Sequence, residues 1–433
     1  MSGLSARVLD PVSTMDPLTV TPGPEPVCRF CSSLLRRTFV DLGTSPLCES
    51  FLSANERYKP ESHYPLHVYV CDACFLVQLE EFVPPEQIFR DYAYFSSYSE
   101  SWLDHARRYV ADMIERLQLD ETSFVIELAS NDGYLLQYFV EQSIPCLGVE
   151  PAINVARVAI EKDVPTLVDF FGTFLAQGLV AGGKRADLIV ANNVLAQVPD
   201  LNDFVRGIRL LLAPCGTVTA EFPHVLRLIA DNQYDTIYHE HFSYFGLGTI
   251  ERIFAKHGLR VFDVDELPTH GGSLRVYARH EAETSRPVKS RVTELREMEE
   301  RAGLQDPERY VEFGRQVEAS KRALLRFLIE AAEANQSVVG YGAPGKGNTL
   351  LNYCGIRPDL LEYTVDRNPH KQGCFLPGSR IPVYAPERIA QTKPDFILIL
   401  PWNLRDEIVN QLAHTQEWGA RLVVPIPRVE VIA

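Results

Sequence analysis

The sequence predicts an α/β protein in which two doubly wound parallel sheets follow an N-terminal metal-binding segment. Three observations support this fold class. Four cysteines between residues 28 and 74 have the spacing of metal ligands, and short apolar runs alternate with amphipathic stretches over residues 123–280. A second series of apolar runs begins at residue 337. The length of 433 residues allows two or three domains, because a single hydrophobic core rarely grows beyond about 250–300 residues.

The composition is that of an ordinary globular protein, with 46% hydrophobic and 23% charged residues. Its net charge of −15 argues against nucleic acid or an anionic membrane surface as the main partner. No apolar run approaches the roughly 18 residues of a membrane span. Residues 1–26 lack the apolar core of a secretory signal, so we expect a flexible tail and a cytoplasmic, reduced protein.

The first predicted domain contains two Cys-x-x-Cys pairs. Two sulfurs on one tight turn can face a single ion, and a second such turn completes a tetrahedral site of four thiolates. Such a site has no open coordination position, so its expected role is structural rather than catalytic. Four unrelated thiols or a redox pair are the alternatives, and no strand-to-helix context favours the redox pair. The predicted Zn²⁺ ligands are Cys28, Cys31, Cys71 and Cys74.

The central part of the chain begins with a predicted strand, turn and helix. Residues 124–128 form a short apolar run, and the turn at 131–133 follows it. A second strand ends at Glu150, whose carboxylate is placed to take both hydroxyls of a ribose. The glycine fingerprint of a pyrophosphate loop is absent, which disfavours a dinucleotide and suits a nucleoside whose amino-acid end lies against this loop. The expected ligand contacts are Glu127, Ala129, Asn131, Asp132, Gly133, Tyr134 and Glu150.

Two further strands follow, and the first of them, at 186–191, leads into Asn192 and Asn193, which we also expect at the ligand. Residues 260–267 and 273–279 are typical of a closing hairpin. Alternating βα units that end in such a hairpin are the class I methyltransferase variation on the doubly wound sheet. On these features alone, a generic Rossmann domain with another ligand stays open.

A glycine-rich segment at 340–346 nearly matches a phosphate-binding loop. Gly347 stands where that loop requires a serine or threonine for Mg²⁺, so we do not expect an NTPase. Backbone N–H groups at a helix N-terminus would still suit the diphosphate of a nucleotide sugar, with Lys346 and Asn348 as contacts. Later apolar runs predict a second Rossmann-like domain.

Six motifs occur in a characteristic order, namely the four cysteines and the segments 127–134, 148–151, 238–244, 271–275 and 340–349. Together they resemble the zinc-containing deoxysugar C-methyltransferases that act on dTDP-4-keto sugars, from about residue 27 to the C-terminus. The resemblance implies S-adenosylmethionine as the cofactor and a structural Zn²⁺. The expected organisation is a flexible tail (1–26), a zinc-binding domain (27–84), a methyltransferase domain (85–282), a helical connector (283–336) and a C-terminal Rossmann-like nucleotide-sugar domain (337–433).

Methylation of a carbon beside a ketone requires a base that removes a proton and donors that stabilise the enolate oxygen. By resemblance, His241 is the base, Tyr238 donates a hydrogen bond to the sugar oxygen, and Glu240 orients the site or contacts the sugar. Tyr238 and His241 share a face if this segment is helical. Family members often carry histidine where this chain has Gln197, so the base is expected among the later histidines. Tyr92 lies in an aromatic segment that resembles the family's lid, and we expect it to contact the substrate as a fourth catalytic residue.

The resemblance implies methylation beside the ketone of a dTDP-4-keto-6-deoxy sugar, at C-3 in preference to C-5, in the biosynthesis of deoxysugars or antibiotic sugars. Two alternatives stay open, an NAD-dependent nucleotide-sugar oxidoreductase and a non-enzymatic zinc-ribbon scaffold. We expect a monomer or a weak homodimer without a nucleic-acid or membrane partner. The expected substrate contacts are Lys346, Asn348, Tyr353, Arg275, His239 and Lys371.

Overall fold

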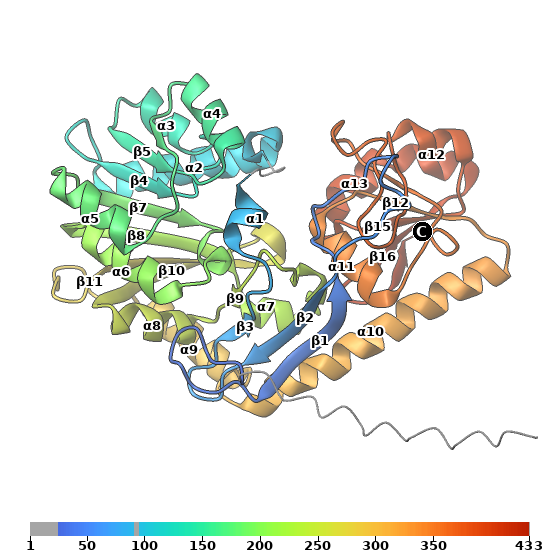
Figure 1. Cartoon of the computed structure of the whole chain (residues 1–433), viewed down its shortest axis with the longest axis horizontal. Coiled ribbons are helices and arrows are strands. Elements are labelled where there is room, and N and C mark those ends of the chain that lie inside the picture. The colour runs from blue at the N-terminus through green and yellow to red at the C-terminus, as the bar shows by residue number, and fades with distance from the viewer. Residues whose placement is uncertain (1–24, 91–94, 433) are drawn as a thin grey trace, which may run out of the picture.

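The computed structural model describes residues 25–90 and 95–432, which form three sheets (Figure 1). Two lobes stand side by side, and the strands β1 and β2 and the long helix α10 join them at the base (Figure 1). Within the described part of the chain, no helix is both long enough and apolar enough to cross a membrane.

The N-terminal sheet is antiparallel and has the order β1-β2-β3-β9. Its last strand comes from much later in the chain, where Ser243 pairs with Gln78. The sequence did not predict this strand, which attaches the segment 238–244 to the N-terminal domain. The strands are β1 (Arg37–Ser45), β2 (Tyr64–Val70), β3 (Val77–Leu79) and β9 (Ser243–Tyr244).

The central sheet has the order β10-β11-β8-β7-β4-β5-β6, in which β11 runs antiparallel to its two neighbours. The strands and the closing hairpin that the apolar runs predict are all present. This order, with an antiparallel hairpin at one edge, confirms the class I methyltransferase fold. The strands are β4 (Val125–Leu128), β5 (Cys146–Val149), β6 (Thr166–Leu167), β7 (Ala186–Asn192), β8 (Leu212–Pro223), β10 (Leu259–Leu267) and β11 (Ser273–His280).

Helices cover both faces of the central sheet, because alternate residues of its strands point to opposite sides. Ile126 shares a core with Phe204 of α6, whereas Val125 shares another with Phe139 of α3. With both faces covered, the ends of the strands are left for a ligand. The helices of this lobe are α1 (Pro85–Phe89), α2 (Glu100–Leu117), α3 (Leu136–Glu141), α4 (Ile153–Glu161), α5 (Thr173–Ala181), α6 (Leu201–Leu211), α7 (Val225–Ala230) and α8 (Leu247–Lys256).

The C-terminal sheet has the order β14-β13-β12-β15-β16-β17 and is parallel except for β17. It confirms the second Rossmann-like unit. Its strands are β12 (Val338–Tyr341), β13 (Thr364–Val365), β14 (Val383–Tyr384), β15 (Phe396–Ile399), β16 (Arg421–Val424) and β17 (Glu430–Ile432). Its helices are α11 (Gly345–Cys354), α12 (Glu387–Thr392) and α13 (Arg405–Gln411).

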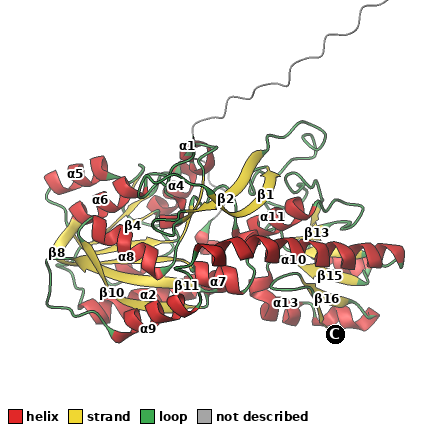
Figure 2. Ribbon diagram, turned by 90° about the horizontal axis from the view of Figure 1, so that it is seen from below, coloured by secondary structure: helices red, strands yellow, loops and turns green. Residues whose placement is uncertain are grey.

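The helices α9 (Ser290–Arg301) and α10 (Pro307–Glu333) follow the central sheet, and α10 extends along the C-terminal lobe (Figure 2). Phe39 of β1 stacks on Phe313 of α10, with ring centroids 4.7 Å apart. Through this packing the N-terminal and C-terminal sheets share one hydrophobic core. Short 3₁₀ helices are η1 (Ser96–Tyr98), η2 (Leu195–Gln197), η3 (Tyr234–Thr236), η4 (Thr269–Gly271), η5 (Trp402–Leu404) and η6 (Ala413–Trp418).

Candidate active site

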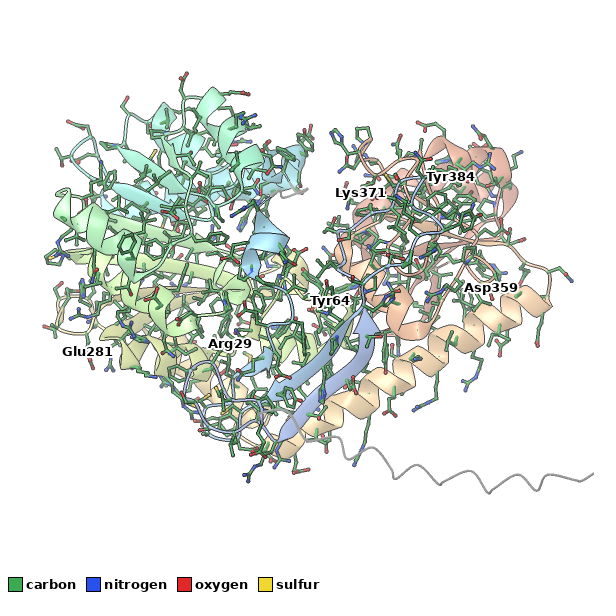
Figure 3. The ribbon with its side chains drawn as sticks, in the orientation of Figure 1. Arg29, Tyr64, Glu281, Asp359, Lys371 and Tyr384 are labelled. Atoms are coloured by element: carbon green, nitrogen blue, oxygen red, sulfur yellow. The ribbon has the colours of Figure 1, made fainter. Side chains whose placement is uncertain are left out.

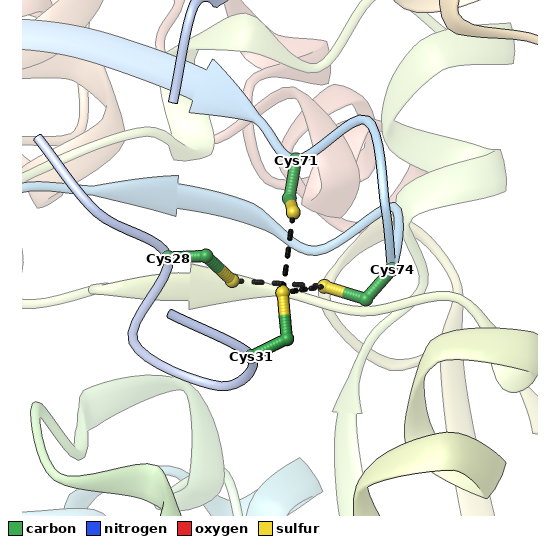
Figure 4. A group of neighbouring side chains, drawn as sticks. All are labelled: Cys28, Cys31, Cys71 and Cys74. Carbon is green, nitrogen blue, oxygen red and sulfur yellow. Dashed lines mark hydrogen bonds between the residues drawn. The ribbon is translucent and has the colours of Figure 1, made fainter. Parts of the chain in front are cut away.

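The four predicted zinc ligands converge from two turns (Figure 4). In each turn the first cysteine's carbonyl accepts a hydrogen bond from the residue four positions later, at 2.8 Å for Cys28 and 2.9 Å for Cys71. The Sγ atoms of Cys28 and Cys74 are 3.6 Å apart, and those of Cys31 and Cys71 are 3.5 Å apart. Thiolates about 2.3 Å from a tetrahedral zinc ion lie roughly 3.8 Å from one another. The sulfurs therefore fit Zn²⁺ in a structural role.

A cavity of about 580 Å³ lies between the central and the C-terminal sheets. Ligands of open parallel sheets bind at the carboxyl ends of the strands, where the strand order reverses. That reversal falls between β4 and β7 in the central sheet and between β12 and β15 in the C-terminal sheet. The carboxyl ends of these four strands, or the segments that follow them, reach the cavity through Asn131, Asn192, Lys346 and Asn403. Both doubly wound units therefore open into the same space.

The loop after β4 forms the first wall of this cavity. Ala129, Asn131 and Gly133 have left-handed backbones, with φ of 57°, 50° and 75°. The resulting sharp turn lets the N–H of Asn131 donate to one oxygen of Glu150 at 2.8 Å, while the N–H of Ala152 donates to the other, also at 2.8 Å. Burial raises the pKa of Glu150 to about 7. The predicted cofactor residues that line the cavity are Ala129, Asn131, Tyr134, Glu150, Asn192 and Asn193.

This wall fits the nucleoside part of S-adenosylmethionine. Glu150 supplies a carboxylate at the end of the second strand, where a ribose is bound in such sheets. The Asn192 side-chain oxygen is buried and has no hydrogen-bond partner among the described residues. A buried acceptor without a partner is costly, so a ligand that donates to it would be stabilising. Gln197, at the place of the family's frequent histidine, also lines the cavity.

Three other predicted cofactor residues do not line the cavity. Glu127 and Asp132 are buried. Asp132 accepts a hydrogen bond from the N–H of Ser97 at 3.3 Å, which attaches η1 to the loop. A Cβ atom on Gly133 would lie 3.0 Å from Val164, so this position requires glycine for packing as well as for its positive φ.

Three of the catalytic residues expected from the resemblance, Tyr238, Glu240 and His241, lie together on a turn that lines the cavity. The N–H of His241 donates to the Tyr238 carbonyl at 3.0 Å, and the two ring centroids are 4.3 Å apart. The segment is thus a turn, not a helix, but it still places both rings on one side. Burial, the main cause, and the nearby His270 and Lys346 lower the pKa of His241 to about 3, so the imidazole is neutral at pH 7 and is a weaker base than an ordinary histidine. Burial raises the pKa of Tyr238, which stays a hydrogen-bond donor.

The neighbours of these two residues hold the turn in place. His239 approaches the Pro65 carbonyl with Nε2 at 3.1 Å, which attaches the turn to β2. Glu240 lines the cavity, and its Oε1 lies 3.7 Å from the Sγ atom of Cys48. Cys48 belongs to the segment between the two zinc-binding turns. The zinc-binding domain therefore contacts the candidate catalytic turn directly.

Lys346 lies in the first turn of α11 and forms part of the opposite wall. Its Nζ atom donates to the Asn403 side chain at 2.7 Å and lies 4.7 Å from the Trp402 ring centroid. Burial lowers its pKa. A cation beside a helix N-terminus suits a phosphate group.

Lys371 also lines the cavity, from the side of the C-terminal lobe that faces the other lobe (Figure 3). Its Nζ atom donates to the Ala343 carbonyl at 2.8 Å and lies 3.3 Å from an oxygen of Glu49. Glu49 comes from the segment between the cysteine pairs. The N-terminal and C-terminal domains therefore meet at this cavity through an ion pair.

The structure does not bring four of the expected substrate contacts to the cavity. Arg275 is buried and donates to the Glu221 carboxylate at 2.7 Å. Asn348 donates to the Cys48 carbonyl at 2.6 Å, and the Tyr353 ring packs against Tyr234. His239 is the fourth, bound to Pro65 as described above. Tyr92 lies outside the described residues.

Several cavity residues were not predicted from the sequence. Asn403 follows the predicted strand at 396–400 and lines the cavity. Because ligands bind beyond the carboxyl ends of parallel strands, this position could have been predicted from the sequence. His270 lies in the loop of the predicted hairpin, beside two glycines. Glu49 and Trp102 have no signal in the sequence, since their place depends on how distant segments pack.

Family comparisons agree with this architecture. Three family models match: a C-methyltransferase C-terminal domain over residues 268–427, a zinc binding domain over 28–89 and a methyltransferase domain over 102–264. The C-methyltransferase NovU of Streptomyces niveus is 36% identical over 407 residues, which are 94% of this chain and 96% of that protein.

Solved structures are similar over a smaller part of the chain. A SAM-dependent methyltransferase from Anabaena variabilis aligns with a TM-score of 0.34 and 15% identity, over 40% of this chain and 84% of its own. Magnesium protoporphyrin IX methyltransferase ChlM from Synechocystis, with bound SAH, aligns with a TM-score of 0.33 and 13% identity, over 41% of this chain and 82% of its own.

The fold, the cofactor wall and the four-cysteine site define an S-adenosylmethionine-dependent methyltransferase with a structural zinc site. The chain is 36% identical in sequence to NovU over nearly the full length of both proteins. It therefore belongs to this family of C-methyltransferases. This membership contradicts the two alternatives, the NAD-dependent oxidoreductase and the non-enzymatic scaffold.

Proposed function

We propose that the protein methylates a carbon beside the ketone of a dTDP-4-keto-6-deoxy sugar, at C-3 in preference to C-5, in deoxysugar or antibiotic-sugar biosynthesis. One observation carries this proposal. The turn with Tyr238 and His241 lines the cavity onto which both doubly wound sheets open at the point where their strand order reverses. A nucleoside cofactor on the β4–β7 side and a nucleotide sugar on the β12–β15 side would meet at this turn.

The turn supplies a base and a donor in contact with each other. His241, neutral at pH 7, accepts the proton from the carbon beside the ketone, and the electron pair of the C–H bond forms an enolate. The hydroxyl of Tyr238 donates to the enolate oxygen. When bound, S-adenosylmethionine would supply the electrophilic methyl group that the enolate carbon takes up, with the electron pair of the S–CH₃ bond left on sulfur. His241 then releases its proton to solvent.

The C-terminal wall suits the diphosphate of the sugar nucleotide. Lys346 and Lys371 place two cations at this wall, where Glu49 pairs with Lys371 and Lys346 has no carboxylate partner among the ion pairs of the described residues. The backbone N–H groups at the start of α11 add donors of the kind that bind phosphate. Asn403 holds the Lys346 ammonium group at the cavity.

The direct test supplies S-adenosylmethionine with a ¹³C-labelled methyl group and dTDP-4-keto-6-deoxyglucose to the purified protein. We expect a new carbon-bound methyl signal beside the ketone in the NMR spectrum. Label on oxygen or nitrogen would contradict the enolate mechanism and leave the cofactor assignment intact. Loss of the sugar's α-proton to D₂O without methyl transfer would show that the base acts but the acceptor position is wrong.

The His241→Asn variant tests the proposed base. We expect turnover to fall by about 100-fold to 10,000-fold, the usual contribution of a general base, while the affinity for S-adenosylmethionine stays within twofold. His414→Asn is the matched control, because His414 is exposed on η6. Turnover near the wild-type rate in His241→Asn would assign the base to another group.

A further inference from the structure

His270 lines the cavity together with His241 and Lys346, and the mechanism above leaves it without a role. It lies at the tip of the β10–β11 hairpin, in η4. Its ring packs edge-on against Trp102, with centroids 5.2 Å apart. Within the described ranges, neither ring nitrogen of His270 makes a hydrogen bond. A ligand in the cavity can therefore bind this imidazole without displacing a protein partner.

The backbone of His270 is in the left-handed region, with φ 55° and ψ 20°, a conformation that is uncommon for residues other than glycine. The residues on both sides are fixed. Thr269 donates to the buried carboxylate of Glu221 at 3.0 Å, and the Gly271 carbonyl accepts from the Gln233 side chain at 2.7 Å. Glycine would fit this backbone with less strain. The fixed backbone on both sides therefore determines where the His270 side chain lies at the cavity.

We propose that His270 is a second hydrogen-bond donor to the carbonyl oxygen of the keto sugar, so that Tyr238 and His270 hold the enolate oxygen together. This inference rests on the proposed function. A carbonyl oxygen has two lone pairs, and the Tyr238 hydroxyl can fill one of them.

The electrostatic setting of His270 agrees with a neutral donor. The side chain of His270 is accessible within the cavity, but the protein groups around it, chiefly by partial desolvation and with the nearby Lys346 ammonium group, lower its pKa to about 4, although Glu221 opposes them. At pH 7 the ring therefore carries one N–H group and no charge. Such a group stabilises the enolate oxygen where its charge develops, and it leaves proton acceptance to His241.

The test compares wild type with His270→Gly and His270→Asn, because glycine and asparagine both tolerate a left-handed backbone. Two rates are measured: methyl transfer to dTDP-4-keto-6-deoxyglucose, and exchange of the sugar's α-proton into D₂O with S-adenosylhomocysteine in place of the methyl donor. Enolate formation moves the α-proton to His241 and returns a deuteron from solvent, so exchange reports the step that the donor assists.

For His270→Gly we expect kcat and exchange to fall together by about 100-fold, the usual cost of losing one oxyanion donor. KM is expected within threefold of wild type and Tm equal to or above it, since glycine relieves the backbone. His270→Asn, which keeps an N–H donor, should recover at least fivefold of the loss. Lys393→Gly is the control, because Lys393 is exposed with φ 50°, so it reports strain relief without loss of activity.

If His270→Gly keeps the wild-type kcat and the wild-type rate of α-proton exchange, the inference about His270 is wrong, whereas the proposed function stands. A fall in Tm with the loss of activity would also overturn it, in favour of a structural role. A higher KM with unchanged kcat would assign His270 to binding of the ground state and not the enolate. If wild-type protein neither exchanges the α-proton nor transfers methyl, the proposed function fails and the inference with it.

Discussion

Glu150 illustrates how the fold positions a single candidate contact for the cofactor. Two backbone amides, from Asn131 and Ala152, orient its carboxylate at the end of β5. They favour the charged form, but burial outweighs them and raises the pKa to about 7. The carboxylate is therefore half-ionised near neutral pH.

This pKa predicts that cofactor binding depends on pH. The charged form is the better acceptor for ribose hydroxyls, and it is lost as the pH falls below about 7. The affinity for S-adenosylmethionine should rise by up to about tenfold between pH 6 and pH 8, as one proton is released. Isothermal titration calorimetry over this range measures the effect. Glu150→Gln should bind weakly at both pH values, and a tenfold dependence in that variant would assign the proton to another group.

At the residue scale, the sequence predicted correctly that residues at strand ends line the cavity. It did not predict which side chains instead contact residues far away in the chain. Glu150 and Asn192 end apolar runs, so a local pattern places them at the ligand edge of the sheet. Arg275 and Asn348 belong to motifs of the resemblance, but their partners are Glu221 and the Cys48 backbone. No local pattern reveals such partners.

At the scale of elements, β3 connects the metal site with the candidate catalytic turn. It follows the second zinc-binding turn and pairs with β9, which follows the turn that carries His241. Gln78 of β3 also donates to the Cys28 sulfur at 3.1 Å. The sequence could not predict β9, because two residues give no periodicity.

This connection predicts that removal of zinc abolishes methyl transfer, although the metal has no catalytic role. Chelation should lower Tm by about 5 °C or more, because structural zinc stabilises the fold, and activity should fall in parallel. Metal analysis should find one zinc ion per chain, and added Zn²⁺ should restore both properties. Cys215→Ser, at an exposed cysteine outside the cluster, is the control. Full activity after complete zinc removal would contradict the connection.

At the scale of the whole molecule, two doubly wound sheets face each other across the cavity, and the N-terminal sheet and α10 hold them at the base (Figure 1). The apolar runs predicted both sheets. Their relative placement could not be predicted, since it depends on the packing of β1 on α10 and on the ion pair between Glu49 and Lys371.

The proposed cofactor wall and the proposed sugar-nucleotide wall belong to different lobes. We therefore expect that a substitution in one wall weakens the binding of one ligand only. Lys346→Met should raise the KM for the dTDP sugar by about tenfold to 100-fold, the usual cost of a lost charged hydrogen bond. The affinity for S-adenosylmethionine should stay within twofold, because the cofactor wall belongs to the other lobe. Lys393→Met, on the exposed end of α12, is the control. Equal losses for both ligands would show that the walls are not independent.

The pairing of β3 with β9 has a consequence for how the chain folds. Gln78 and Ser243 lie far apart in the chain, and most of the central sheet lies between them. The zinc-binding segment leaves the ribosome first, so it can acquire its metal early, but its sheet stays incomplete until most of the central lobe has been synthesised. Contacts of such long sequence separation form late and slowly. The proposed base and donor of the turn therefore reach their places near the end of folding, and we expect a partly folded chain to be inactive.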